Sequence, residues 1–278
     1  MDLESDIERA VAQALAEDIG SGDATAALVP ENFTAHARIV AREESVLCGA
    51  VWLDQVFRHL DRRINVRWHV RDGDKVAANN VICDLRGPAR SLLTGERTAL
   101  NFLQTLSAVA TKTRAYVQAV TGTRAAILDT RKTLPGLRLA LKYAVTTGGG
   151  VNHRIGLYDG ILIKENHISA AGGIPQVLAA ARKISGDIPI QVEVENMEQL
   201  EQALANGATL VLLDNFTVSN MEKAVILTAG RAQLEASGGI TLQNVRGVAE
   251  TGVDRISVGA LTKDIKAVDL SMRFVSMA

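Results

Sequence analysis

Aromatic residues, cysteines and long apolar runs are all scarce in this sequence of 278 residues. Phe, Trp and Tyr together make up 4% of the chain, and Ala, Val, Leu and Ile dominate the apolar positions. That composition favours close-packed α/β layers over an all-β sandwich, in which aromatic residues are enriched. Because no apolar run approaches the roughly 18–20 residues needed to cross a bilayer, we expect no membrane-spanning segment and no membrane partner.

Cysteine is limited to Cys48 and Cys83, which excludes a disulfide framework and a CxxC zinc site. Both lie in apolar surroundings, SVLCGAV and NVICDL, where buried and reduced thiols are expected. Excess charge is lacking too, since the formal net charge is −1, and this argues against a nucleic-acid partner. The first residues, MDLESDIERA, are acidic and amphipathic, unlike a signal or transit peptide, so we expect a cytoplasmic protein.

The N-terminal third mixes short strands with helices. Apolar spacing predicts helices over residues 5–17 and 51–60, and the alternating segment 65–87 suggests antiparallel strands around an Asp72-Gly73 turn. A longer helical pattern runs from Leu92 to about Val120. We therefore predict an N-terminal α+β sandwich domain over residues 1–110, to which a C-terminal tail of about 268–278 is expected to return.

From residue 124 onward, short apolar runs alternate with helical segments. The runs are AAILD, GILIK, PIQVEVE, LVLLDN, AQLEASGG and RISVGAL. Such alternation indicates a parallel sheet, either open and doubly wound or closed as a (β/α) barrel. Even spacing, the lack of GxGxxG after the first strand, and polar residues at every strand end favour the barrel, which gathers its strand ends on one face. Six strands rather than eight predict an incomplete (β/α) barrel over residues 111–267, carrying the active site.

Positive charge is concentrated between Leu128 and Ile168. Asp159 is the only acid between Arg131 and Lys164, and Gly148–Gly150 lie in the middle. The basic residues are Arg131, Lys132, Arg138, Lys142, His153, Arg154 and Lys164. Cations around bare backbone suggest a small, highly anionic ligand. A solvated basic surface is the alternative, but several of these cations directly follow apolar runs that are typical of buried strands.

The later strands supply acids and glycines. Glu193 and Glu195 share one face of a predicted strand and Asp214 ends the next, an arrangement that suits Mg²⁺, although salt bridges to nearby cations are the alternative. The segments SGGI at 237–240 and SVGAL at 257–261 resemble loops that bind phosphate through backbone N–H groups. Since no nucleophile triad or redox motif is apparent, the residues indicate a transferase or lyase acting on a phosphosugar and an anionic co-substrate.

The segment DTRKTLPGLRLALKYAVTTGGGVNHRIGLYDGILIKENHI closely resembles the signature of the quinolinate phosphoribosyltransferases, the carboxylating nicotinate-nucleotide pyrophosphorylases. The resemblance covers nearly the whole chain. It extends to ED…GD.T near Asp18–Thr25, GERTALNFLQ at 95–104, QVEVEN at 191–196, LLDNF at 212–216, EASGGI at 235–240 and SVGALT at 257–262.

The resemblance implies a type II phosphoribosyltransferase of de novo NAD biosynthesis. Quinolinate and phosphoribosyl pyrophosphate would yield nicotinate mononucleotide, pyrophosphate and CO₂, with Mg²⁺ as cofactor. It also implies a homodimer in which the sandwich of one subunit packs against the barrel of the other.

The resemblance also assigns roles to individual residues. Lys132, Glu193 and Asp214 would be catalytic, and the two acids would face the ribose and the metal. The quinolinate pocket would be lined by Arg131, Lys132, His153, Arg154 and Lys164, with Arg97 donated across the dimer. Phosphate groups would bind at Ser237, Gly238, Gly239 and Gly259. Lys263 stands where many members carry histidine, and a lysine there would still serve a pyrophosphate.

Two other functions compete with this interpretation. One is a ModD-like relative acting on another substrate, against which the intact GGGVNHR and GERTALN segments argue. The other is a non-catalytic phosphosugar-binding barrel, which predicts the loss of some acids or cations. Glu193 and Asp214 are both present, as are the expected cations, which favours the enzyme.

Overall fold

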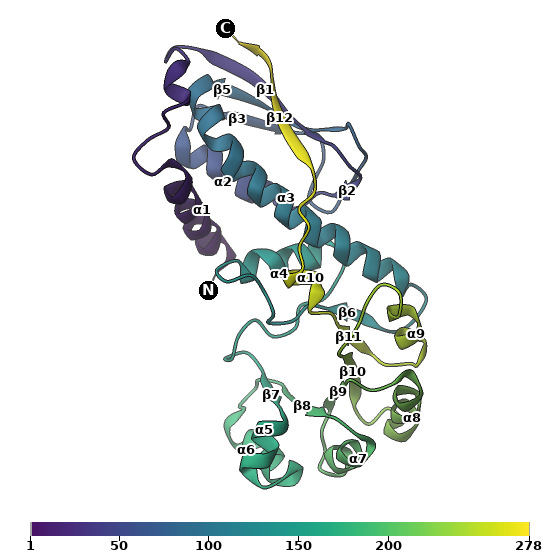
Figure 1. Ribbon diagram of the computed structural model, residues 1–278. Helices are drawn as coiled ribbons and strands as arrows, with labels where there is room; N and C mark the ends of the chain where they lie inside the picture. The colour runs from purple at the N-terminus through teal and green to yellow at the C-terminus, as the bar shows by residue number, and fades with distance from the viewer. Residues whose placement is uncertain (1, 278) are drawn as a thin grey trace. The chain divides into compact units, whose positions relative to one another are not determined.

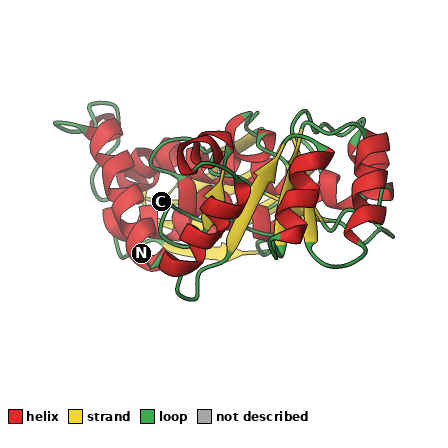
Figure 2. Cartoon of the chain, turned by 90° about the horizontal axis from the view of Figure 1, so that it is seen from below, coloured by secondary structure: helices red, strands yellow, loops and turns green. Residues whose placement is uncertain are grey.

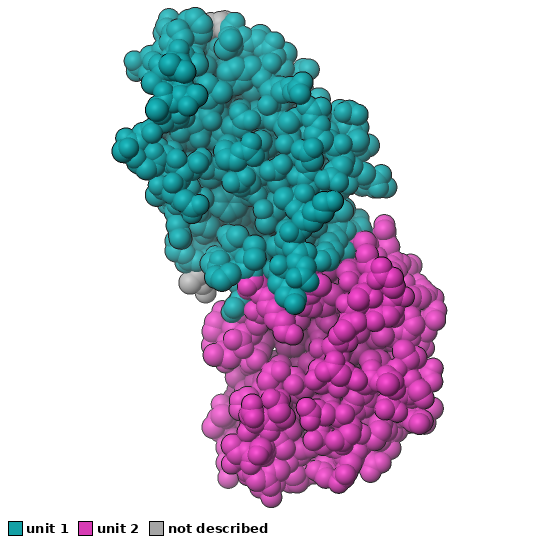
Figure 3. All heavy atoms as spheres, in the orientation of Figure 1, with its two compact units in different colours: residues 1–114, 134–149, 262–278 teal, residues 115–133, 150–261 magenta. Residues whose placement is uncertain are grey.

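The computed structural model describes residues 2–277, which form two compact units (Figure 3). Unit 1 comprises the described residues of 1–114, 134–149 and 262–278, and unit 2 comprises 115–133 and 150–261. The division at 110/111 expected from the sequence stays a prediction, and its outer limits, 1 and 278, lie outside the described residues. Across the described part of the chain, every helix is too short or too polar to traverse a bilayer.

Unit 1 contains a four-stranded antiparallel sheet in the order β12-β1-β5-β3, together with several helices (Figure 1). Its strands are β1 (Thr34–Ala41), β2 (Ser45–Val46), β3 (Asn65–Trp68), β4 (Lys75–Val76), β5 (Val81–Pro88) and β12 (Leu270–Met277). Its helices are α1 (Leu3–Ile19), η1 (Ala26–Leu28), α2 (Ala50–Leu60) and α4 (Arg138–Thr147). Helices α3 (Ala89–Ala119) and α10 (Ala260–Lys263) each continue from one unit into the other.

The period-2 pattern of β1 determines which side chains enter the core of unit 1. Ala35, Ala37, Ile39 and Ala41 are buried, whereas the residues between them are more exposed. The C-terminal strand β12 pairs with β1 along almost its whole length, so both ends of the sequence contribute to one sheet.

Asp72 has a different role from the one that the Asp-Gly pattern suggested. Strand β3 pairs with β5 and β4 pairs with β2, so no hairpin surrounds this turn. Instead the Asp72 carboxylate accepts hydrogen bonds from the N–H groups of Gly49 and Ala50 at 3.0 and 3.2 Å, and from the Tyr143 hydroxyl at 2.9 Å. It thereby caps the start of α2 and ties α4 to it.

Unit 2 is a parallel sheet of six strands surrounded by helices (Figures 1 and 2). The strands are β6 (Ala126–Leu128), β7 (Ile161–Ile163), β8 (Ile190–Val194), β9 (Leu210–Asp214), β10 (Gln233–Ser237) and β11 (Arg255–Ser257). The helices are α5 (Glu165–Ala171), α6 (Ile174–Ile184), α7 (Met197–Ala205), α8 (Val218–Thr228) and α9 (Val245–Glu250).

The strand order in unit 2 is β6-β11-β10-β9-β8-β7, so the first strand pairs with the last. That order is typical of a barrel, and β6 and β7 are not paired with each other among the described residues. The predicted fold, a mixed sandwich domain plus an incomplete (β/α) barrel with six strands, is therefore confirmed. Strands β8 and β9 are largely buried on both faces, which explains their near-continuous apolar sequences.

Asp84 of β5 is one source of pH-dependent stability in unit 1. Its carboxylate is bonded to Arg38 Nε at 2.8 Å, His69 Nε2 at 2.6 Å and His36 Nε2 at 2.5 Å. Burial by itself raises the pKa of Asp84, but the hydrogen bonds from Arg38, His69 and His36 outweigh it and hold the pKa well below its usual range.

We predict that Asp72→Ala lowers the free energy of unfolding of unit 1 by about 2–3 kcal/mol, because two helix N–H groups and one hydroxyl lose their acceptor. Tyr143→Phe removes only the hydroxyl and should cost about 1 kcal/mol. Both tryptophans, Trp52 and Trp68, lie in unit 1, so tryptophan fluorescence during urea unfolding measures this effect. Glu44→Ala, at an exposed ion pair with Lys75, is the control; an Asp72→Ala loss no larger than that of the control would contradict the cap.

Asp84→Asn should lower the free energy of unfolding by about 1 kcal/mol at neutral pH. Since the folded-state pKa lies below the unfolded-state value of about 3.9, this stabilisation is present above pH 4 and is lost as the pH falls further. Urea unfolding at several pH values should therefore show the wild-type advantage shrinking in acid. Asp187→Asn, at an exposed carboxylate, is the control, and an advantage that persists unchanged at about pH 2 would disprove the linkage.

Candidate active site

The polar residues of unit 2 gather at one edge of the sheet because all six strands run parallel. Each strand contributes at or just beyond its carboxyl end. Along the chain, these residues are Arg131 and Lys132 after β6, Lys164 after β7, Glu193 in β8, Asp214 in β9, Ser237 with Gly238 and Gly239 at β10, and Gly259 after β11.

Residues 151–153 pair with β6 and thereby bring a second segment to this edge. Val151 N–H donates to the Ile127 carbonyl at 2.8 Å, and Asp129 N–H donates to the Val151 carbonyl at 3.2 Å. The fully buried Asp129 carboxylate then accepts from His153 N–H at 2.9 Å. This short parallel pairing places His153 and Arg154 beside the segment that carries Arg131 and Lys132.

Arg131 and Arg154 form a pair of like charges. Arg154 Nη1 donates to the Gly160 carbonyl at 2.9 Å, and the buried Nε of Arg131 has no acceptor among residues 2–277. Burial lowers the pKa of the Arg154 guanidinium, the neighbouring charge of Arg131 lowers it further, and Asp159 partly opposes both. Two cations that repel each other, one of which has a buried N–H without an acceptor among the described residues, suit an anionic ligand.

Asp159, the only acid between Arg131 and Lys164, shapes the loop beside Arg154. Its two carboxylate oxygens accept from the N–H groups of Ile155 and Gly156 at 2.7 and 2.8 Å. The loop is thus closed by its own carboxylate.

Lys132 extends across the loop that follows β11. A Cβ atom at Gly259 would lie 3.2 Å from Cδ of Lys132 and 3.6 Å from the Thr130 hydroxyl oxygen. Glycine at position 259 therefore lets the lysine chain lie close to the backbone. The two residues that the sequence assigned to quinolinate and to phosphate are direct neighbours.

Lys164 and Glu193 form an ion pair between adjacent strands β7 and β8, with Nζ 2.8 and 3.1 Å from the two carboxylate oxygens. The Glu193 side chain is 10% exposed and that of Lys164 is 46% exposed, so the pair lies at the mouth of the site. In this structure Glu193 therefore makes the salt bridge that the sequence left open as the alternative to metal binding.

Asp214, Asn215 and Gly238 join the ends of β9 and β10. Asn215 adopts a left-handed backbone with φ of 55°, and its N–H donates to the Ser237 carbonyl at 2.9 Å. Its side-chain amide donates to the Asp214 carboxylate, also at 2.9 Å. Gly238 has φ of 96°, and a Cβ atom there would collide with the Asn215 side chain. Only glycine therefore fits at Gly238.

The loop after β10 offers unused hydrogen-bond donors. Within residues 2–277, the backbone N–H groups of Gly238 and Gly239 have no acceptor, and the same is true of Gly259. The Gly239 carbonyl is held by the Asn244 side-chain amide at 2.9 Å. Open N–H groups in a fixed loop are what a phosphate group binds.

Gly148, the first residue of the glycine triplet 148–150, has a packing role. A Cβ atom at Gly148 would lie 2.6 Å from the Ala110 carbonyl oxygen and from Thr113 Cβ, so this glycine allows the end of α4 to approach α3 within unit 1. The sequence had suggested that these glycines form bare backbone around an anion. In the structure, the close packing of α4 against α3 explains why residue 148 is a glycine, without reference to a ligand.

The basic stretch of Leu128–Ile168 is divided between the units. Arg138 and Lys142 lie on α4 of unit 1, where Lys142 is almost fully buried. Two further predicted site residues also belong to unit 1: Arg97 is exposed on α3, and Lys263 is exposed at the end of α10. The remaining predicted site residues all lie in unit 2.

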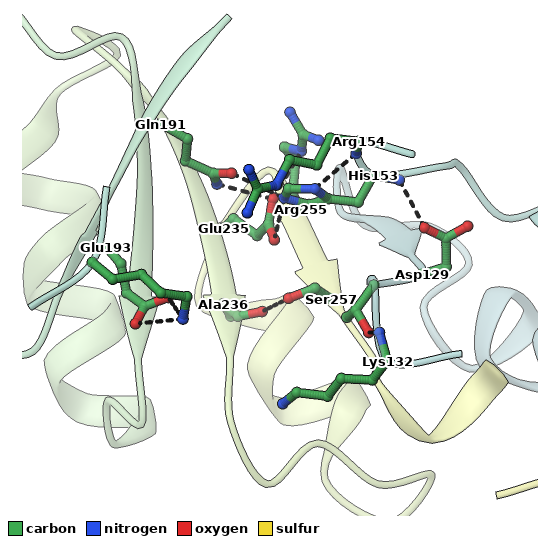
Figure 4. A network of polar contacts seen from close by, with 12 residues as sticks. Asp129, Lys132, His153, Arg154, Gln191, Glu193, Glu235, Ala236, Arg255 and Ser257 are labelled. Atoms are coloured by element: carbon green, nitrogen blue, oxygen red, sulfur yellow. Dashed lines mark hydrogen bonds and ion pairs between the residues drawn. The ribbon is translucent and has the colours of Figure 1, made fainter. Parts of the chain in front are cut away.

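Three polar residues next to His153, two of them buried and one half-buried, were missed in the sequence. Gln191, Glu235 and Arg255 lie in β8, β10 and β11 and form a network that reaches His153 (Figure 4). The available signal was a charged or amide side chain inside an apolar strand, as in QLEAS, because such residues are rarely buried unless they are paired.

We predict that Gly238→Ala lowers the melting temperature of unit 2 by several degrees, since the added methyl group both strains the backbone and displaces Asn215. Gly247→Ala is the matched control, because a Cβ atom there meets nothing within 4 Å and the position is helical. That substitution should be neutral or stabilising by up to about 1 kcal/mol. Scanning calorimetry compares the two, and equal melting temperatures would contradict the steric argument.

Comparison with known proteins agrees with this geometry. Residues 23–107 match the family model "Quinolinate phosphoribosyl transferase, N-terminal domain", and residues 109–273 match the corresponding C-terminal domain. The chain is 44% identical over 257 residues to a probable carboxylating nicotinate-nucleotide pyrophosphorylase of Bacillus subtilis, covering 92% of this chain and 89% of that protein. It is 43% identical to the carboxylating enzyme of Mycobacterium leprae, with 98% of each chain covered.

A solved structure of the nicotinate-nucleotide pyrophosphorylase from Francisella tularensis is also similar. It has a TM-score of 0.96 at 46% identity, and the alignment covers 99% of this chain and 98% of the other. Both domain models and full-length relatives therefore agree along almost the whole sequence. The chain belongs to the quinolinate phosphoribosyltransferase family.

Proposed function

We propose that this member of the family converts quinolinate and phosphoribosyl pyrophosphate to nicotinate mononucleotide, pyrophosphate and CO₂, a step of de novo NAD biosynthesis. The observation that carries the proposal is the arrangement of charge at the carboxyl edge of unit 2. The buried Arg131 Nε without an acceptor among the described residues, an ion-paired lysine and glutamate, and free backbone N–H groups lie at or near neighbouring strand ends.

Quinolinate carries two adjacent carboxylates, so its site must supply several cations. Arg131 and Arg154 provide two guanidinium groups that repel each other when no ligand is bound. A dicarboxylate between them would replace this repulsion with charge-assisted hydrogen bonds. Lys132, which lies across Gly259, would add an ammonium group where quinolinate meets the phosphosugar.

The phosphosugar would bind along β8 to β11. The free N–H groups of Gly238, Gly239 and Gly259, with the Ser237 hydroxyl beside them, suit phosphate oxygens. Glu193 and Asp214 lie on adjacent strands, where their carboxylates would face the ribose. Lys263 of unit 1 stays a prediction as a further pyrophosphate contact.

The donor set at this edge fits Mg²⁺ if the substrate supplies part of the coordination. Among residues 2–277, no three His, Cys, Asp or Glu side chains are grouped to hold a metal ion by themselves. Mg²⁺ commonly takes only one or two carboxylates and completes its shell with water and phosphate oxygens. Glu193 and Asp214 would hold it, and when bound it would offset charge on the leaving pyrophosphate.

The chemistry requires charge stabilisation rather than a covalent catalyst. The pyridine nitrogen of quinolinate attacks the ribose carbon as pyrophosphate leaves, and positive charge develops on the sugar. The carboxylates of Glu193 and Asp214 would stabilise that charge electrostatically. The ring nitrogen then becomes cationic, so the electron pair left by departing CO₂ is stabilised by the adjacent N⁺, and protonation completes the product.

Several predictions from the family resemblance stay predictions. They are a homodimer, donation of Arg97 from a second copy to the quinolinate site, and a cytoplasmic location. The exposure of Arg97 on α3 is compatible with such a donation.

Lys132→Ala and Arg154→Ala should each weaken quinolinate binding by at least about tenfold, because a carboxylate of the bound quinolinate loses a charged partner. Turnover of quinolinate with phosphoribosyl pyrophosphate should fall in parallel and should require Mg²⁺. Calorimetric titration of quinolinate and product absorbance provide the two measurements.

Lys183→Ala removes an exposed lysine from the last turn of α6 in the same unit and is the matched control. It should leave both measurements unchanged. Wild-type protein that binds the phosphosugar but does not consume quinolinate would overturn the proposed reaction in favour of another substrate. Near-wild-type quinolinate affinity in both alanine variants would overturn the residue assignment alone.

A further inference from the structure

Glu235 is an ionisable side chain in the interior of unit 2 that the reaction does not use directly. It lies in the middle of β10 and is 1% exposed. Its strand neighbours in register are Leu212 on β9 and Arg255 on β11. Burying a carboxylate is costly even beside a guanidinium, here that of the half-buried Arg255, and apolar side chains of similar volume are often as stable or more so. The pair therefore calls for an explanation beyond stability.

The carboxylate has two close partners and one incomplete contact (Figure 4). Glu235 Oε2 accepts from the Gln191 side-chain amide at 3.1 Å and lies 3.3 Å from Arg255 Nε. Glu235 Oε1 is buried and accepts no hydrogen bond among the described residues, although His153 Nε2 is 3.5 Å away. Glu235 is thus linked to His153 mainly through Gln191.

The orientation of Gln191 follows from this contact. A carboxylate can only accept, so the amide nitrogen of Gln191 must face Glu235 and its oxygen must face away. That oxygen lies 2.9 Å from His153 Nε2. Since the amide oxygen can only accept, His153 Nε2 must carry a proton.

The other ring nitrogen of His153 is also used within the protein. Arg154 N–H donates to His153 Nδ1 at 2.8 Å, so Nδ1 must present a lone pair. His153 is therefore held as the neutral tautomer protonated at Nε2. Its own N–H is held by Asp129, so backbone and ring are fixed at three points.

We propose that Glu235 is a positioning residue, which acts through Gln191 to hold His153 in one tautomer and thereby orients Arg154 for quinolinate. His153 then supports the site from behind rather than hydrogen-bonding the substrate through its ring. The bond from Arg154 N–H to His153 Nδ1 fixes the backbone from which the guanidinium extends toward Arg131. This inference rests on the proposed function for the identity of the substrate, whereas the tautomer of His153 follows from the hydrogen bonds alone.

The test compares two double variants that both lack Arg255, so that neither leaves the half-buried Arg255 guanidinium without its carboxylate partner. Glu235→Met with Arg255→Met removes the acceptor for Gln191, whereas Glu235→Gln with Arg255→Met keeps an amide oxygen there. Without an acceptor, the Gln191 amide is free to turn over and present its nitrogen to His153. We expect the Met/Met variant to raise the KM for quinolinate about tenfold relative to the Gln/Met variant, with the KM for phosphoribosyl pyrophosphate within about twofold.

The spectroscopic readout is the nitrogen NMR spectrum of the His153 ring. Wild type and the Gln/Met variant should show the Nε2-protonated tautomer at about pH 7.5, and the Met/Met variant should show a mixture of tautomers. Thr251→Val, which removes a buried side-chain hydroxyl elsewhere in unit 2, is the control and should change neither the tautomer nor the KM for quinolinate.

Two results would overturn the proposal. One is a His153 ring in the wild type that is protonated at Nδ1, or at both nitrogens, at about pH 7.5. That measurement requires neither a folded variant nor enzyme turnover. The other is an equal tautomer and an equal quinolinate KM in the two double variants. Failure of the proposed function would appear differently, as absence of quinolinate turnover in wild type whose His153 ring still shows the Nε2-protonated form.

Discussion

The parallel pairing between β6 and residues 151–153 is the interaction on which the site depends. Two backbone hydrogen bonds to Val151 and one from His153 to Asp129 hold a long connection against the first strand of the barrel. Without them, the segment that carries Arg154 would have no fixed relation to Arg131 and Lys132. Burial of Asp129 strengthens the arrangement, because a buried carboxylate that loses its donors is expensive.

Much of unit 2 could be predicted from the sequence, because the alternation of apolar runs with helical segments determines both the parallel sheet and the edge of that sheet where the site lies. All six apolar runs form strands, and their polar ends meet because the strands are parallel. The sequence could not show which interior groups touch. The contact between Gln191 and Glu235 depends on the register of three strands, and nothing local in either segment encodes it.

Local patterns were misleading where one residue serves a distant element. Asp72-Gly73 has the sequence of a hairpin turn, yet Asp72 caps a helix that begins 22 residues earlier in the chain. Gly148 belongs to a glycine run that suggested bare backbone around an anionic ligand, yet its packing against α3 gives it a steric role of its own. Both functions depend on tertiary contacts, which override short-range preference.

Charged groups in the interior of unit 2 and at its edge differ in how completely they are bonded within the protein. The buried carboxylate of Glu235 is paired with the half-buried Arg255, whereas nearer the edge the buried Nε of Arg131 has no acceptor among the described residues. A ligand that supplies the missing anions would therefore stabilise the folded unit as well as bind to it. Positive charge that lacks a neighbouring anion allows the site to bind an anionic ligand, and it also makes the ligand-free protein less stable than it could be.

The chain passes between the two units at 114/115, 133/134, 149/150 and 261/262. Neither unit is therefore a continuous piece of sequence, and no single cut separates them. A fragment limited to 115–261 would carry residues 134–149 away from the rest of unit 1. It would expose the buried face of α4, including Leu141, Val145 and the buried ammonium group of Lys142. Folding of the barrel and of the sandwich is thus coupled through the covalent path of the chain itself.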